Sequence, residues 1–191
     1  MIFRLTLKLA KKIGIAHLPV ISCEEGRNRL IDWSANLFKV QHTQFIILTN
    51  TVSLYSMVMH GQGITNDKQF VRDVFRHMKE FMTIDGNKVI FESFIEPRDK
   101  NVAFSKIVDR RVLGSMNDLV FQAKVLLSEG QKLPFDISFL LNESPMSYLN
   151  YNCPKDEFQK LHILDAGSPV NGNRGNNVIY INAVRPPPVK L

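Results

Sequence analysis

Two spacings of hydrophobic residues follow one another along the chain, and each predicts one kind of element. Residues 33–40, 45–50 and 54–60 are rich in β-branched, aromatic and threonine side chains, and short polar stretches separate them. Runs of this composition are typical of strands. Because connections this short favour antiparallel neighbours, we expect the three runs to form a β-meander.

Helical spacing of the apolar residues predicts two longer helices and one short helix. The longer helices span residues 65–83, with Thr65 as the N-cap, and 112–128. The short helix spans residues 6–13, where Thr6 can cap the first turn. Each of these segments has an apolar stripe on one side and charged residues on the other, as expected of surface helices.

Three further segments have weaker patterns. Residues 88–96 favour a short helix that ends before a proline, and residues 101–107 favour a strand. Residues 135–141 fit either a strand or a helical turn. We therefore leave the last segment open between the two.

These elements together predict an α+β fold, with a small antiparallel β-sheet covered by two longer helices. We expect one domain over residues 1–158 and a partly irregular C-terminal extension over residues 159–191. In that extension, residues 167–177 hold three glycines and four asparagines, and residues 178–184 favour one strand. The prolines at 186–188 end any regular pairing.

The composition is that of an ordinary folded domain. The 191 residues are 45% hydrophobic and 22% charged, which excludes disordered, collagen-like and coiled-coil chains. The two cysteines, Cys23 and Cys153, make no disulfide framework and no CxxC zinc pair. The five histidines are scattered without helical pairing, so we expect no metal and no cofactor.

The sequence also bears on compartment. Residues 40–66 lack charged residues but contain many glutamine, asparagine, serine and threonine side chains, so they do not resemble a membrane span. Lysines interrupt the apolar residues near the start before a signal-peptide core forms. We expect a soluble cytoplasmic protein with reduced thiols and no membrane contact.

Positive charge is concentrated at the two ends of the chain. Residues 1–29 carry a net charge of +4 and residues 159–191 carry +3, whereas residues 30–158 carry −1. Basic ends can steer a protein to nucleic acid, or they can simply keep a small domain soluble. The candidate residues for nucleic-acid contacts are Arg4, Lys8, Lys11 and Lys12.

The first candidate motif is the segment 32–36, which holds the single tryptophan, Trp33, next to polar residues. Trp33 and Asn36 offer an aromatic plate and an amide, which together suit a planar ligand such as a base. Alternatively, Trp33 is a core anchor whose ring N–H finds a backbone acceptor.

The second candidate motif is the most polar stretch of the chain, and it lies at the predicted junction between a strand and a helix. A helix N-terminus favours anions, and neighbouring cations add to that field, so phosphate binding is chemically sensible here. Alternatively, the acidic residue caps the helix and the arginine pairs with a carboxylate. The candidate ligand-binding residues are Lys106, Asp109, Arg110, Ser115, Asn117 and Asp118.

Familiar catalytic motifs are missing from the sequence. It contains no G-x-S-x-G elbow, no Walker loop and no G-x-G-x-x-G fingerprint. No D-x-D follows Ser115, so a two-metal site of the nucleotidyltransferase kind cannot form there. We therefore assign no catalytic residue.

At its motifs the chain resembles a bacterial family of uncharacterised domains. The motifs are T-x-K-L at residues 6–9, W-x-A-N-L at 33–37, N-x-x-S/T-x-Y at 50–55 and a D-R-S-V-L-G-S-M-N-D type stretch at 109–118. Arg111 stands where that family often has serine. The resemblance covers roughly residues 1–150 and implies a domain boundary and motif positions, but no activity.

The prediction that follows is a non-enzymatic binding or regulatory module with a nucleic-acid or protein partner. The alternative is an enzyme acting on a phosphorylated or nucleotide-like ligand at the Lys106–Asn117 junction. We expect Trp33 and Asn117 to approach each other, directly or through Arg110. A cleft lined by Trp33, Asn36, Arg110 and Asn117 would favour the enzyme. A flat surface there would favour the module.

Overall fold

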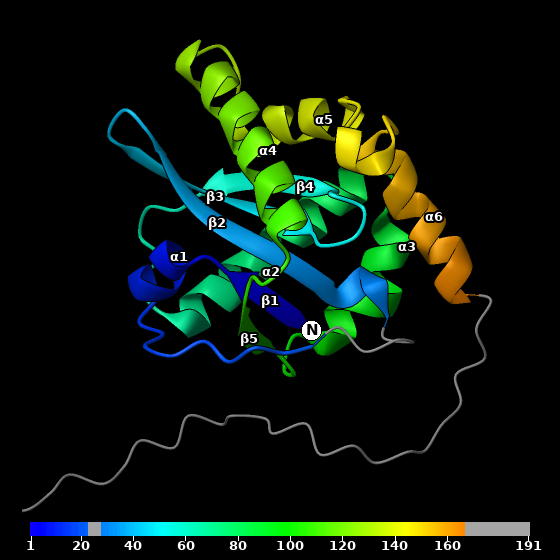
Figure 1. Ribbon diagram of the computed structural model, residues 1–191, viewed down its shortest axis with the longest axis horizontal. Coiled ribbons are helices and arrows are strands. Elements are labelled where there is room, and N and C mark those ends of the chain that lie inside the picture. Colours follow the sequence, from blue (N-terminus) through cyan, green and yellow to red (C-terminus); the bar gives the residue numbers. More distant parts are fainter. Residues whose placement is uncertain (23–27, 167–191) are drawn as a thin grey trace, which may run out of the picture.

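The fold is a five-stranded mixed sheet with helices on both faces (Figure 1). A computed structural model describes residues 1–22 and 28–166; the rest of the expected C-terminal extension, 167–191, lies outside the described residues. The strands are β1 Ile2–Leu5, β2 Asp32–Val40, β3 Thr43–Asn50, β4 Ser56–His60 and β5 Ala103–Lys106. The helices are α1 Leu7–Lys12, α2 Asp67–Ile84, α3 Lys88–Ile90, α4 Arg110–Ser128, α5 Pro134–Glu143 and α6 Pro154–Ala166.

The α+β class predicted from the sequence is confirmed, and so is the meander. The strand order is β4-β3-β2-β1-β5, and β2, β3 and β4 are antiparallel neighbours. The sheet is not antiparallel throughout, however, because β1 runs parallel to both β2 and β5. The connections from β1 to these strands contain helices and loops, which are long enough to return the chain to the same end of the sheet.

The two longer helices cover opposite faces of the sheet and produce two hydrophobic cores. On one face, Trp33 and Leu37 of β2 pack with the buried side of α2 and with Phe158 of α6. On the other face, Phe38 of β2 packs in a second core that includes Met116 of α4. Because side chains alternate along a strand, β2 contributes its odd positions to the first core and even positions to the second.

The outer edge of the sheet at β4 is covered by α5 rather than by another strand. The Ser138 hydroxyl accepts a hydrogen bond from the Val58 amide at 2.8 Å. The Asn142 side chain accepts from the Ser56 amide at 2.7 Å and donates to the Ser56 carbonyl at 2.9 Å. Ser138 and Asn142 lie one helical turn apart, so a helix presents both side chains to the strand. This pairing explains why residues 134–143 are a helix, and it satisfies an edge that would otherwise be open.

Helix boundaries differ slightly from those predicted. Asn66, rather than Thr65, caps α2, since its side chain accepts from the Gln69 amide. The predicted short helix before Pro97 is present, but it passes from α3 into a π-helical turn over Phe91–Ile95 and a 3₁₀ turn over Glu96–Arg98. None of the helices in residues 1–22 and 28–166 combines the length and apolar content needed to cross a membrane.

Candidate binding site

A row of polar side chains runs straight across the sheet on the face that α4 covers. The five residues are opposite one another in register, one from each strand, and none is more than 3% exposed. In order from β5 to β4 they are Ser105, Arg4, Ser34, Thr49 and Ser56. Burying polar groups is costly unless they are hydrogen-bonded, so their partners determine what this row can do.

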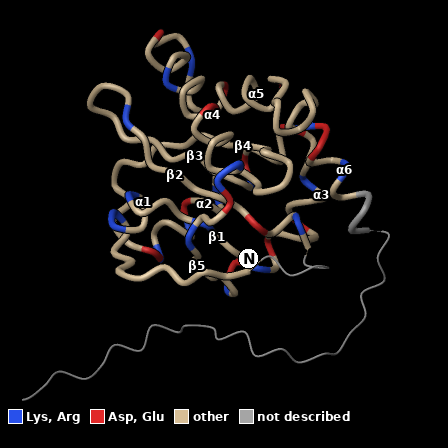
Figure 2. The backbone as a smooth tube through the Cα atoms, viewed as in Figure 1, with Lys and Arg blue, Asp and Glu red and all other residues tan. Residues whose placement is uncertain are grey.

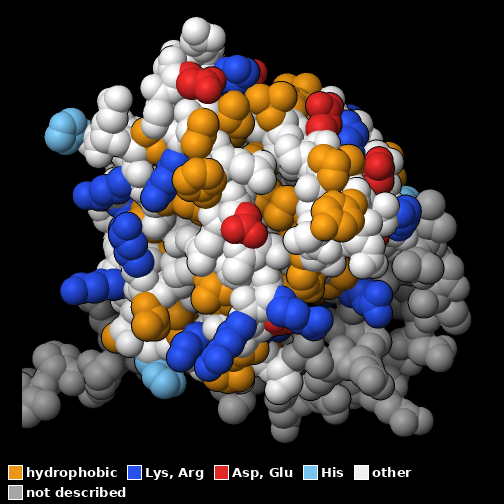
Figure 3. All heavy atoms as spheres, turned by 45° about the horizontal axis from the view of Figure 1, so that its top comes forward, with side chains coloured by type: hydrophobic (Ala, Val, Ile, Leu, Met, Phe, Trp, Pro, Cys, Tyr) orange, Lys and Arg blue, Asp and Glu red, His pale blue; other side chains and the backbone are white. Residues whose placement is uncertain are grey.

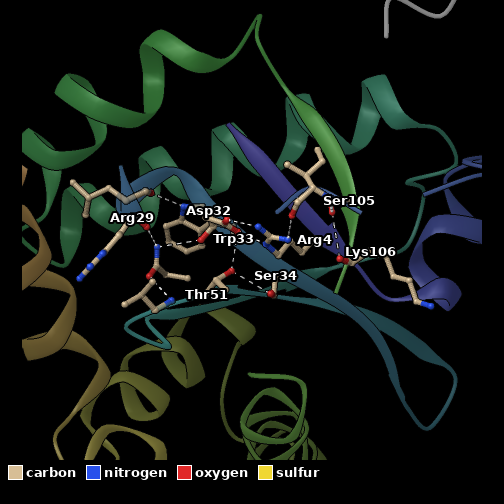
Figure 4. A network of polar contacts seen from close by, with 12 residues as sticks. Arg4, Arg29, Asp32, Trp33, Ser34, Thr51, Ser105 and Lys106 are labelled. Carbon is tan, nitrogen blue, oxygen red and sulfur yellow. Dashed lines mark hydrogen bonds and ion pairs between the residues drawn. The ribbon is translucent and has the colours of Figure 1, made fainter. Parts of the chain in front are cut away.

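The charged member of the row, Arg4, forms a buried ion pair with Asp32 (Figure 4). Its Nε donates to Asp32 Oδ1 at 2.7 Å, and its Nη2 donates to Asp32 Oδ2 at 2.8 Å. Its Nη1 donates to the Ile21 carbonyl at 2.8 Å. The two side chains are 4% and 3% exposed. Two parallel N–H···O bonds fix the planar guanidinium in one orientation.

The hydroxyl groups beside this pair form a short chain. Thr51 Oγ1 donates to Asp32 Oδ1 at 3.0 Å, and Ser34 Oγ lies 3.3 Å from Thr51 Oγ1. On the other side of Arg4, the Ser105 hydroxyl accepts from the Ile21 amide at 3.0 Å and donates to the Pro19 carbonyl at 3.1 Å. These contacts attach the segment before residue 22 to the outer side of β5.

A pocket of about 360 Å³ opens over the middle of this polar row, between the sheet and the beginning of α4. Its floor is polar, one wall is apolar, and a carboxylate lies in its lining at the start of α4. The lining residues are Arg4, Ser34 and Thr51 on the floor, Ile107, Val108 and Val112 in the wall, and Asp109. The volume is in the range of small-molecule sites.

Asp109 caps α4, as predicted. Its Oδ1 accepts from the Arg111 amide at 2.8 Å and from the Val112 amide at 3.4 Å, and Arg111 Nε lies 3.9 Å away. These amides belong to the first turn, so the favourable positive end of the helix is already occupied by a carboxylate. An external anion would have to displace Asp109 to reach it.

The cations of the second motif do not line the pocket. Lys106 and Arg110 are exposed, and the predicted pairing of Arg110 with a carboxylate is wrong, since it makes no ion pair with a described residue. Arg110 lies on the exposed side of the first turn of α4, where it stays hydrated, whereas Val112 of the same turn is buried.

Trp33 and Asn117 do not form a shared site. Trp33 is fully buried on the opposite face of the sheet from α4; its Nε1 donates to the Leu30 carbonyl at 2.8 Å, and its ring packs against Tyr55 and Phe158. Asn117 is exposed on α4. The prediction that the two approach each other is therefore wrong, and the core-anchor interpretation of Trp33 is confirmed.

The remaining candidates of the two motifs are dispersed. Asn36 accepts a hydrogen bond from the Thr6 hydroxyl at 3.1 Å, which links β2 to the start of α1. Ser115 is buried, whereas Asp118 is exposed on the outward side of α4. Only Asp109 among the predicted ligand-binding residues lines the pocket.

The outward side of α4 has an unusual composition. Phe121 is 68% exposed and Val125 is 46% exposed, and apolar side chains gather around α4 and α5 in Figure 3. Gly114 is also exposed, and a Cβ at this position would meet no atom within 4 Å. Neither the large apolar side chains nor the glycine is required by packing within the described chain.

The basic N-terminal cluster is smaller than predicted. Arg4 is buried with Asp32 and cannot contact a nucleic acid. Lys8 and Lys11 are exposed on α1, and Lys12 Nζ donates to Gln44 Oε1 at 2.5 Å. Figure 2 shows the positive residues of α1 at one side of the molecule. The described residues contain no group of His, Cys, Asp and Glu side chains placed to hold a metal ion.

Sequence reasoning missed most of the pocket, although two signals were available. In β2 the polar residues Asp32, Ser34 and Asn36 occupy alternate positions, which is the pattern of a strand with one polar face. Arg4 is likewise a lone charge in an apolar strand, which predicts a buried partner. Both signals point to the face where the pocket lies.

The fold and site define an α+β domain with a pocket on one face of its sheet. The chain belongs to the family described as Domain of unknown function (DUF6933), whose model matches residues 2–157. The match includes every described residue that lines the pocket. The membership of an uncharacterised family inferred from the motifs is confirmed. No curated protein matches the chain.

Proposed function

We propose that this protein is a non-enzymatic binding module that holds a small ligand in the pocket over Arg4, Ser34 and Thr51. The observation that carries this proposal is the cavity of about 360 Å³ above a floor of buried polar side chains. Protein interiors are normally filled to crystal-like density, and burying polar groups costs free energy. A cavity above buried polar side chains therefore indicates a functional role. A mainly apolar wall with a few convergent polar groups is the usual make-up of a ligand site.

The chemistry of the floor favours binding over catalysis. Both oxygens of Asp32 accept hydrogen bonds from Arg4, and one of them also accepts from Thr51, so this carboxylate is engaged within the fold rather than directed at a ligand. Among the described residues, the lining holds no histidine, lysine or cysteine that could activate Ser34 or Thr51. The groups present can orient a ligand but cannot readily move its protons.

A pocket-filling variant tests the proposal. Val108 is 52% exposed in the wall, so Val108→Trp can occupy the pocket without disturbing a core. Val125→Trp on the outward side of α4 is the matched control, with 46% exposure. In a thermal-shift screen of small polar compounds, we expect hits that stabilise the wild type and Val125→Trp but not Val108→Trp. Hits that stabilise all three alike, or no hits, would overturn the proposal.

A second candidate function is docking of a protein partner on the outward side of α4. The specific observation is that Gly114 and the exposed Phe121 lie two turns apart on this side, and that no packing among the described residues requires either. A glycine lets another backbone approach closely, and an exposed aromatic side chain is a frequent anchor at interfaces.

Site-specific photo-crosslinking distinguishes this second candidate. A photo-reactive phenylalanine analogue at position 121 should crosslink a protein in cells, and Gly114→Leu should abolish that crosslink. The same analogue at Ile84, which is 67% exposed on α2, is the control and should give no such product. Equal crosslinking at both positions would contradict docking on α4.

A further inference from the structure

We infer that a groove beside α1 binds a single-chain anionic amphiphile, meaning a molecule with one short alkyl chain and an anionic group at its end. This site is separate from the pocket over Arg4 and goes beyond the function proposed for that pocket. The groove has a volume of about 400 Å³, near the lower end of the range for small-molecule sites, which suits one chain better than the two chains of a membrane lipid. It lies between α1 and the segment that follows, and its lining includes Leu7, Lys11, Ile15, Ala16 and Leu18.

The groove offers an alkyl chain a continuous apolar surface. Ile15 and Leu18 are half-buried and pack against the core on the α2 face of the sheet. Leu7 on the rim is 69% exposed and belongs to neither hydrophobic core. A single exposed leucine is common on protein surfaces, but this one adjoins a groove lined by other apolar residues. An alkyl chain placed here would therefore remove apolar surface of both molecules from water.

Lysines at the rim of the groove provide the contact for the anionic end. Lys8 and Lys11 are exposed and lie one turn apart on α1, and Lys11 lines the groove. Among the described residues, no carboxylate pairs with Lys8, Lys11 or Lys12. The described lining also contains no aspartate or glutamate. An anion at the rim therefore meets positive charge that no described carboxylate neutralises.

The spacing of these lysines is unfavourable for α1 itself. Lys8, Lys11 and Lys12 are three and four positions apart, where like charges on a helix repel each other. The last turn favours Lys11 and Lys12, but Lys8 lies in the first turn, where the helix dipole disfavours a cation. That turn contains no acidic residue, and Lys12 donates to the neutral Gln44 side chain. An anion bound beside Lys8 and Lys11 would reduce this repulsion.

A fourth lysine adds to the positive field at this end of the sheet. Lys106 is exposed and stands opposite Leu5 in register, two residues before α1 begins. Its amide donates to the Pro19 carbonyl at 2.9 Å, at the end of the segment that lines the groove. In Figure 4 its side chain points away from the Arg4–Asp32 pair. Among the described residues it has no ion-pair partner, so its charge adds to the attraction of an anion.

The combination of charge and apolar surface favours an amphiphile over a nucleic acid. Contacts with a phosphate backbone require an array of cations but no apolar groove. Here the lysines lie at the edge of a groove whose described lining is mostly apolar. A molecule with an anionic end and an alkyl chain uses both parts of this surface.

Three compounds with the same eight-carbon chain test the ligand class: octanoate, octan-1-ol and octylammonium, which are anionic, neutral and cationic. Each is titrated as a monomer, below the concentration at which it forms micelles, into the full-length protein with isotope-labelled methyl groups. Binding is followed by NMR shifts of the Leu7, Ile15 and Leu18 methyl groups. We expect saturable shifts with octanoate, and dissociation constants about fivefold weaker for octan-1-ol and at least about tenfold weaker for octylammonium.

A double lysine variant tests the charged rim. Lys8→Gln combined with Lys11→Gln should weaken octanoate binding about fivefold, as expected for two exposed charge contacts, and should leave octan-1-ol binding unchanged. The matched control combines Lys100→Gln with Lys124→Gln, which removes the same charge at two exposed lysines outside the groove. This control should bind all three compounds as the wild type does.

Leu7→Ser tests the apolar part of the groove. It should weaken the binding of octanoate and octan-1-ol alike, by about fivefold, because both compounds place the same chain against this side chain. Ile84→Ser on α2 is the matched control, since Ile84 is 67% exposed and lies outside the groove. Both replaced side chains are largely exposed, so both variants should fold, and thermal unfolding checks that they do.

Several results would overturn the inference. Equal affinities for the three compounds, or an unchanged octanoate affinity in the double lysine variant, would exclude an anionic ligand class. Unchanged binding by Leu7→Ser would exclude the groove as the place of the chain. If octanoate shifted the methyl groups of Ile107, Val108 and Val112 instead, it would occupy the pocket over Arg4, and only the function proposed for that pocket would stand.

A titration without saturable shifts would also overturn the inference. The double lysine variant then identifies what the lysines serve instead. If it weakened the binding of a short DNA duplex, the lysines would belong to a nucleic-acid surface. If it weakened the sedimentation of the protein with vesicles that contain phosphatidylglycerol, they would belong to a membrane-binding surface.

Discussion

Arg4 reaches back along its strand to bind Asp32, two register positions away. Asp32 stands opposite Ile2 in the parallel pair of β1 and β2, whereas Arg4 stands opposite Ser34. The guanidinium therefore spans the two strands diagonally, and its two short bonds to the carboxylate connect residues that are 28 positions apart in sequence. Because β1 lies between β2 and β5 in the order β4-β3-β2-β1-β5, this pair connects the parallel strands with the antiparallel meander that begins at β2.

The first prediction concerns the stability that this pair provides. Asp32→Asn removes the charge and replaces one acceptor by a donor, which leaves a buried guanidinium without its counter-charge. We expect the free energy of unfolding to fall by about 3–5 kcal/mol, as measured by urea unfolding at neutral pH. The control is Glu96→Gln, which breaks an exposed pair with Lys79 and should leave the unfolding midpoint unchanged. An equally small effect at Asp32 would show that the pair contributes little.

The second prediction concerns a closed polar cluster beneath α6. Asp85 is buried and accepts from the Tyr55 hydroxyl at 2.5 Å, from Asn87 Nδ2 at 3.0 Å and from Lys155 Nζ at 2.6 Å. Burial and, secondarily, the charge of Asp85 raise the pKa of Tyr55, so its proton stays in the hydrogen bond. Lys155→Met should lower the free energy of unfolding by about 1–3 kcal/mol, because one oxygen of a buried carboxylate loses its donor.

Lys160→Met is the matched control for this cluster, since Lys160 is on the same helix but pairs only with Glu157 at the surface. Its unfolding midpoint in urea should match that of the wild type. Equal midpoints for the two lysine variants would contradict the importance of the Lys155–Asp85 pair.

The third prediction is a dependence of stability on pH that comes from His77. Burial lowers the pKa of His77 to about 4, a hydrogen bond with the Val58 backbone opposes this shift, and the charges of Arg76 and His60 add to it. His77 Nε2 is buried without a hydrogen-bond partner, and the ring packs against Phe135. In the unfolded chain the same group titrates near its ordinary pKa of about 6.5.

The sign of the effect follows from these two pKa values. Between about pH 6.5 and pH 4, the unfolded chain binds a proton at this histidine and the folded chain does not, so acidification favours unfolding. The free energy of unfolding should fall by up to roughly 3 kcal/mol across this window and show no further change from His77 below it. The stability of His77→Phe, measured in urea at each pH, should fall less steeply over the same range. The control is His42→Phe, at an exposed position in the β2–β3 turn, which should keep the wild-type dependence of the free energy of unfolding on pH. If His77→Phe and the wild type showed the same dependence, the pH effect could not be assigned to His77.

The strand periodicity carried more information about the site than the motifs did. Trp33 and Asn36 were treated together because they are close in sequence and chemically interesting. They are three positions apart, however, and in a strand an odd separation places two side chains on opposite faces. The same spacing that predicts the strand thus separates the aromatic ring from the amide and places Ser34 on the face of Arg4.

Other features have no local signal. The parallel direction of β1 depends on its pairing with β2 and β5. The residues that pair with β1 lie 30 positions further along the chain in β2 and about 100 positions further in β5. The choice of helix for residues 134–143 depends on the amide and carbonyl groups of β4 that Ser138 and Asn142 bind. The pocket exists because these long-range pairings bring the start of α4 over the polar row, so it could be predicted only after the topology was known.

The last prediction concerns Gly114 in the second turn of α4. Glycine in a helix interior is less favourable than alanine by about 1 kcal/mol, chiefly because the unfolded chain has more freedom to lose. Its φ is not in the left-handed region, and a Cβ there would meet no atom within 4 Å, so nothing in the described fold compensates for this cost. Gly114→Ala should therefore raise the free energy of unfolding by about 0.5–1 kcal/mol in urea experiments on the isolated protein.

Gly61→Ala is the opposite case and serves as the control. A Cβ at Gly61 would lie 3.1 Å from Ile46 Cγ1 and 3.4 Å from the Phe45 backbone, so the substitution should destabilise the protein by about 1–3 kcal/mol. A stabilised Gly114→Ala that also loses the crosslink formed at position 121 would show that the glycine serves an approaching partner rather than the fold. A destabilised Gly114→Ala would instead mean that the helix itself requires glycine at this turn, and the argument for docking on α4 would then rest on Phe121 and Val125 alone.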